Sequence, residues 1–172
     1  MTRILPILLF AVTASAATPA FSPSVPDVEV VTHEGKKVRF YSDLVKGRTV
    51  AVNFIYTSCS TICPSTGALF AALQTEHERV QFISVSIDPE TDTPPKLAAW
   101  SNRFRKTPQW TLVTGSQAAI EKIVKAFGLT TARPQDHSPL TIVGSDKTGH
   151  WSKLYGFAGS DRIAKVVAEV TK

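Results

Sequence analysis

The sequence predicts an α/β fold in which a central mixed β-sheet is flanked by helices. Runs of β-branched and aromatic residues alternate with segments of helical periodicity, a pattern typical of a sheet covered on both faces. Residues 48–56 (RTVAVNFIY) are almost continuously apolar, as a buried central strand should be. An N-terminal β-hairpin precedes this strand, two cysteines follow it, and a hairpin and a helix end the chain. This order is typical of the thioredoxin-like group.

Turn and cap residues separate the expected elements. We expect strands at residues 28–31, 37–40, 48–56, 80–87, 110–113, 140–143 and 151–154. We expect helices at residues 64–77, 94–104, 117–127 and 161–170. Pro64 suits a first helical turn, where its missing N–H leaves no donor unpaired. Ser116 and Ser160 suit N-caps, and Gly128 suits a helix end.

The N-terminus predicts export. An apolar run at residues 4–14 follows Arg3 and ends in an A-x-A-like cleavage site at residues 14–16. The run is short for a membrane span, so an uncleaved membrane anchor is the less favoured alternative. We expect a signal peptide at 1–16, an extended proline-containing linker at 17–26, and one folded domain at 27–172. The mature protein would then be soluble and periplasmic, or otherwise exported.

The composition fits one globular domain, with 172 residues of which 43% are hydrophobic and 19% charged. The net charge is +5, but the lysines and arginines are scattered along the chain. Such a distribution argues against nucleic-acid binding and is more compatible with an acidic protein partner or an anionic membrane surface. We expect a monomer.

The two cysteines, Cys59 and Cys63, stand between the central strand and the next helix. A helix N-terminus favours the thiolate, and an oxidising compartment would close two nearby thiols into a disulfide. A purely structural disulfide across so short a loop would contribute little stability. Structural zinc requires four ligands, whereas two thiolates and one imidazole suit Cu(I). The pair is therefore interpreted as a redox disulfide or a soft-metal site.

Of the four histidines, His137 is the candidate third ligand. It ends a polar loop just before the strand at residues 140–143, at the sheet edge expected to hold the cysteine turn. His33 and His150 fall in hairpin turns and His77 near a helix end, so we expect all three to be solvated.

Three motifs together resemble the signatures of the Sco/SenC family: CSTICP at 59–64, SIDPETDTP at 86–94 and DHS at 136–138. Members of that family are exported, thioredoxin-like copper chaperones that help to assemble the dinuclear copper centre of cytochrome c oxidase. The resemblance implies copper ligands at Cys59, Cys63 and His137, and an acidic loop that includes Asp88 and Asp92 as accessory residues. A helix-initiating turn is the alternative role for both aspartates. Likeness to thioredoxins also predicts a cis bond before Pro139.

Two functions remain open at this point. The first is a non-enzymatic chaperone that carries one copper ion, Cu(I) or Cu(II), to the copper-bearing subunit of cytochrome c oxidase or a similar client. Its other partners would be a copper donor and a thioredoxin-like reductant. The alternative is a thiol-disulfide oxidoreductase that reduces the cysteines of a client copper site. A peroxidase is less favoured, because no activating arginine accompanies Thr57 and Cys59.

Overall fold

The structure is a computed structural model that describes residues 21–129, 134–136 and 138–172. In this part of the chain seven strands form one sheet, in the order β2-β1-β5-β4-β3-β6-β7. They are β1 (Glu29–Thr32), β2 (Lys37–Arg39), β3 (Thr49–Ile55), β4 (Val80–Ser86), β5 (Trp110–Thr114), β6 (Leu140–Ser145) and β7 (His150–Tyr155). The central strands β3, β4 and β5 are parallel, and the outer strands pair antiparallel. The predicted mixed sheet and N-terminal hairpin are confirmed.

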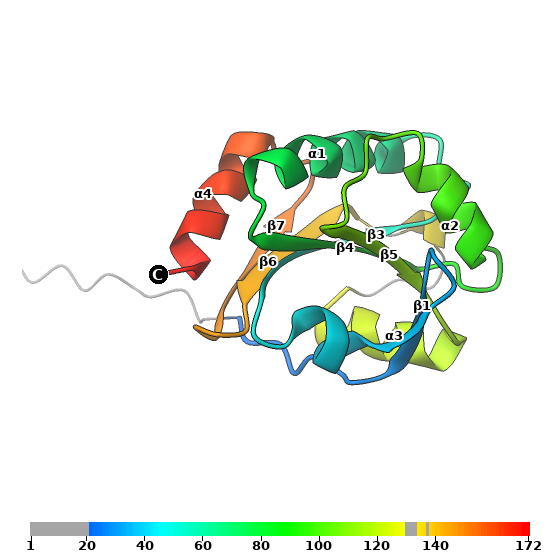
Figure 1. The fold of residues 1–172 in the computed structure, drawn as a ribbon, viewed down its shortest axis with the longest axis horizontal. Helices are drawn as coiled ribbons and strands as arrows, with labels where there is room; N and C mark the ends of the chain where they lie inside the picture. Colours follow the sequence, from blue (N-terminus) through cyan, green and yellow to red (C-terminus); the bar gives the residue numbers. More distant parts are fainter. Residues whose placement is uncertain (1–20, 130–133, 137) are drawn as a thin grey trace, which may run out of the picture.

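Helices cover both faces of the sheet (Figure 1). One face carries α1 (Ile62–Glu76), α2 (Pro94–Ser101) and α4 (Ser160–Val170), and the other carries α3 (Gln117–Ala126) and the π-helix η1 (Phe40–Val45). A short 3-10 helix, η2, spans Pro134–Asp136. Two buried hydrophobic clusters fill the two interfaces, and each has aromatic rings in edge-to-face contact at its centre. Both cysteines belong to the cluster beneath α1.

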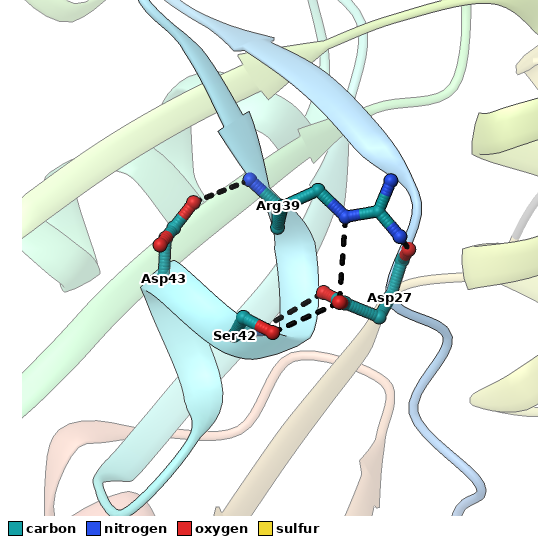
Figure 2. Close-up of polar contacts among 4 residues, drawn as sticks. All are labelled: Asp27, Arg39, Ser42 and Asp43. Atoms are coloured by element: carbon teal, nitrogen blue, oxygen red, sulfur yellow. Dashed lines mark hydrogen bonds and ion pairs between the residues drawn. The ribbon is translucent and has the colours of Figure 1, made fainter.

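The π-helix η1 was not predicted, and a set of polar contacts holds its first turn (Figure 2). The Asp27 carboxylate accepts hydrogen bonds from the backbone N–H and the hydroxyl of Ser42, at 2.9 and 2.8 Å. The Arg39 guanidinium also contacts Asp27, while the Arg39 backbone N–H donates to Asp43. These contacts hold Asp27, the first residue of the predicted domain, against η1.

Three expectations about single residues were wrong. His33 is buried, because its backbone and Nδ1 pair with Leu112 of β5 and extend the sheet beyond β1. Ser160 is the first residue of α4, and Gly159 before it is the N-cap. The bond before Pro139 is trans, as no cis peptide occurs among the described residues; the trans isomer is the lower-energy form of most X–Pro bonds.

Three other expectations hold. Ser116 caps α3, since its hydroxyl accepts from the Ala119 N–H at 3.2 Å, and Gly128 after that helix has φ +70°. His150 is exposed, as expected. A fourth expectation was wrong, because His77 at the end of α1 is half-buried and its Nε2 is enclosed. None of the helices in the described ranges combines the length and the hydropathy needed to cross a bilayer.

Candidate functional site

The structure brings the two cysteines together at the N-terminus of α1. Cys59 lies in the loop that leaves β3, and Cys63 lies in the first turn of the helix. The backbone N–H of Cys63 donates to the Cys59 sulfur at 3.4 Å. Thr61 is the N-cap residue, but its side chain makes no capping bond. The Cys59 sulfur therefore accepts from one of the N–H groups that a helix start leaves without an intrahelical partner.

This arrangement shifts the pKa values of the two thiols in opposite directions. Burial by itself raises the pKa of Cys59, but hydrogen bonds from the Cys63 thiol and from the backbone of Cys63 and Thr61 lower this pKa to about 6. Burial and the hydrogen bond to Cys59 raise the pKa of Cys63 to about 12. At neutral pH the pair thus holds one thiolate, on Cys59, and one proton, on Cys63. Both are free thiols in the structure, with exposures of 5% and 1%.

Tyr56, the first residue after β3, also contacts this thiolate. Burial and a side-chain hydrogen bond with Cys59 raise the pKa of the Tyr56 hydroxyl to about 12. The hydroxyl therefore keeps its proton at neutral pH and can donate to the sulfur. Sequence reasoning did not select Tyr56, and no motif marks it.

The Asp92 carboxylate ties the cysteine loop to the turn after β4. Asp92 is 0% exposed and accepts hydrogen bonds from the Thr57 N–H, the Thr57 hydroxyl at 2.5 Å and the Ser86 hydroxyl at 2.7 Å. Its charge also helps to raise the pKa of Cys63. These bonds favour the structural role over metal ligation for Asp92.

Asp88 occupies the start of the same turn. Its carbonyl oxygen accepts the backbone N–H groups of Thr91 and Asp92, and its own N–H donates to the Ser86 hydroxyl. Asp88 is half-exposed.

The predicted third ligand, His137, lies outside the described residues. The segment after it enters the sheet beside the cysteine loop, because Thr141 of β6 pairs with Asn53 near the end of β3. Within the described ranges, no group of three histidine, cysteine, aspartate or glutamate side chains is placed to hold a metal ion. The two sulfurs form a soft donor pair that suits Cu(I) and needs at least one further ligand for a three-coordinate site.

A dithiol at the start of the helix that follows the central strand, in a sheet of this topology, defines a thioredoxin-like thiol protein. The family model described as SCO1/SenC matches residues 17–171. The chain therefore belongs to the SCO1/SenC family.

Individual relatives agree with this family. A SCO1 protein homolog from Bacillus subtilis is 32% identical over 139 residues, which cover 77% of this chain and 67% of the relative. A Stutzerimonas stutzeri protein whose name describes it as copper-binding is 30% identical over 156 residues, which cover 81% of this chain and 74% of the relative.

Solved structures match the fold. A SCO1/SenC family lipoprotein from Bacillus anthracis superposes with a TM-score of 0.77 and 26% identity, covering 91% of this chain and 100% of that one. BsSco is described as a member of the Sco family of cytochrome c oxidase assembly proteins in which a disulfide switch was identified. It superposes with a TM-score of 0.74 and 27% identity, covering 88% of this chain and 94% of that one. These matches confirm the predicted thioredoxin-like fold.

Proposed function

We propose that this protein is an exported copper carrier that binds one copper ion and delivers it to the dinuclear copper centre of cytochrome c oxidase. Membership of the SCO1/SenC family supports a role in the assembly of that oxidase, as the description of BsSco states for that protein. The name of the Stutzerimonas stutzeri relative supports copper as the cargo. The expected signal peptide at residues 1–16 supports delivery outside the cytoplasm.

One observation about the site carries the proposal. Cys59 and Cys63 are neighbouring sulfurs at a helix N-terminus, and only one of them bears a proton at neutral pH. A Cu(I) ion that binds both sulfurs must therefore displace about one proton, from Cys63, instead of two. His137 would supply the imidazole nitrogen, and the positive end of α1 would stabilise the negative charge of two thiolates.

The test is a titration of Cu(I) into the reduced protein against a competing chelator. We expect one ion per chain, with two sulfur neighbours and one imidazole nitrogen in X-ray absorption. The variants Cys59→Ser, Cys63→Ser and His137→Ala should each weaken binding. Ser60→Ala and His150→Ala are matched controls, because both residues are exposed and neither is a proposed ligand. A stoichiometric complex that survives the double Cys→Ser substitution would contradict the proposal.

The second candidate function is a thiol-disulfide reductase, and the opposite pKa shifts of the two thiols favour it. The Cys59 thiolate would attack a client disulfide to form a mixed disulfide, and Cys63, after losing its proton, would displace the client thiol. Two electrons pass to the client, and the protein is left with a Cys59–Cys63 disulfide, which a thioredoxin-like reductant would reduce.

The substitution His137→Ala separates the two functions. It should abolish Cu(II) binding and weaken Cu(I) retention, but leave reduction of a test disulfide nearly unchanged, because exchange requires no imidazole ligand. Cells that carry this variant should then lack oxidase activity, with partial restoration by excess copper. Normal oxidase assembly with His137→Ala, combined with failure of Cys59→Ser, would favour the reductase.

A further inference from the structure

Two aromatic side chains remain exposed at the turn between β7 and α4. Tyr155 is 61% exposed and Phe157 is 56% exposed, and they are the large hydrophobic side chains that stand out to solvent in the described part of the chain. They flank Gly156, whose φ of +76° is readily adopted only by glycine. The turn thus presents both rings on the surface, although neither is needed to fill the core.

This turn lies at the end of the molecule that holds the dithiol. The Gly156 N–H donates to the Pro139 carbonyl at 2.9 Å, and Tyr155 pairs with Leu140 at the start of β6. Strand β6 in turn pairs with β3, which leads into the cysteine loop. Ala158, the residue after Phe157, is buried in the same hydrophobic cluster as Cys59 and Cys63.

The burial of the sulfurs explains why a partner would need such a surface. Cys59 is only 5% exposed, so a partner's ligand can take an ion from it only when the partner lies in close contact with the surface around the site. A ligand exchange of this kind requires the two proteins to stay in register while bonds form and break. Aromatic side chains provide large contact areas at low entropic cost and dominate many interfaces.

We propose that Tyr155 and Phe157 form the docking surface for the protein that receives the cargo. This inference rests on the proposed function. The partner is a protein that presents an apolar surface beside its own cysteine or histidine ligands, so that its apolar surface covers the two rings while those ligands reach Cys59 and Cys63. The same contact would exclude water from the site during transfer.

The test compares transfer to a protein with transfer to a small molecule. The full chain loaded with Cu(I) is mixed either with the reduced, copper-free soluble domain of the oxidase copper subunit or with a small Cu(I) chelator. We expect the double variant Tyr155→Ser/Phe157→Ser to lose at least about tenfold in the rate of transfer to the domain, as is typical when a hot-spot pair is removed. Its transfer to the chelator should be unchanged.

Two further variants serve as controls. His150→Ser changes an exposed residue at the other end of β7 and should transfer copper to the domain at the wild-type rate. Tyr155→Phe/Phe157→Tyr preserves both rings and should also transfer normally. Circular dichroism should show that all variants are folded, because the substituted side chains contribute little to the core.

The possible outcomes are distinct. If wild type loads no copper, the proposed function fails, and the docking proposal fails with it. If wild type loads copper and the double Ser variant transfers it to the domain at the wild-type rate, only the docking proposal is overturned. A dimer that dissociates on the double substitution would assign the surface to a second copy. If the double Ser variant becomes newly sensitive to a protease within residues 1–20 while transfer is unchanged, the surface would be assigned to the chain's own N-terminal segment. Either result would overturn the proposal.

Discussion

Replacement of Asp92 by asparagine should destabilise the protein and change the acidity of its dithiol. The carboxylate accepts three hydrogen bonds, two from Thr57 and one from Ser86. The amide of asparagine keeps one acceptor oxygen but directs an NH₂ group towards a donor. We therefore expect a loss of roughly 2–4 kcal/mol in the free energy of unfolding, because hydrogen bonds to a charged group contribute about 1.5–3 kcal/mol each.

The same substitution removes a negative charge that raises the pKa of Cys63. The upper of the two thiol pKa values should therefore fall in Asp92→Asn. Urea unfolding measures the first effect, and the ultraviolet absorbance of the thiolate measures the second. Glu90→Gln is the matched control, since Glu90 is an exposed carboxylate of the same turn. A stability change below about 0.5 kcal/mol, which is ordinary for a surface position, would refute the reasoning.

Three further predictions follow from other parts of the structure. Alkylation of the reduced protein should modify Cys59 first, with a rate that rises through a midpoint near the pKa of about 6 given by the hydrogen bonds to its sulfur. Gly144→Ala should cost about 1–3 kcal/mol, because a Cβ there would lie 2.0 Å from the Trp151 ring; Gly115→Ala, with contacts no closer than 3.5 Å, is the control. Burial lowers the pKa of His33, so this histidine binds a proton more readily in the unfolded chain. The stability that the neutral, buried His33 contributes is therefore present above about pH 6.5 and is lost as the pH falls towards the lower folded pKa. His33→Gln should reduce this acid-dependent loss of stability, measured by urea unfolding at about pH 7.5 and 5.5.

Each of these predictions has a result that contradicts it. An alkylation midpoint near about 8.5, the value of an ordinary thiol, would mean that the helix start does not stabilise the Cys59 thiolate. Equal stability of Gly144→Ala and Gly115→Ala would show that the Trp151 ring moves aside without cost. Equal acid sensitivity of wild type and His33→Gln would show that other groups account for the loss of stability at low pH.

The sequence by itself determined the order of the elements and the place of the dithiol. The apolar run before the cysteines predicted β3, and Pro64 together with helical spacing predicted α1, so that Cys59 and Cys63 had to meet at a helix start. Strand periodicity and helix signals depend on neighbours in the chain, which is why they can be identified without coordinates. The three motifs then indicated the family.

Only the tertiary structure decided what surrounds the sulfurs. The hydrogen bond that Thr57 donates to Asp92 joins residues 35 positions apart, and Leu112, which donates to His33, is 79 positions away from it. The opposite pKa shifts of Cys59 and Cys63 arise because one sulfur accepts the hydrogen bonds while the other is buried and donates. Burial and hydrogen-bond direction depend on how distant segments pack, and no local pattern encodes that packing.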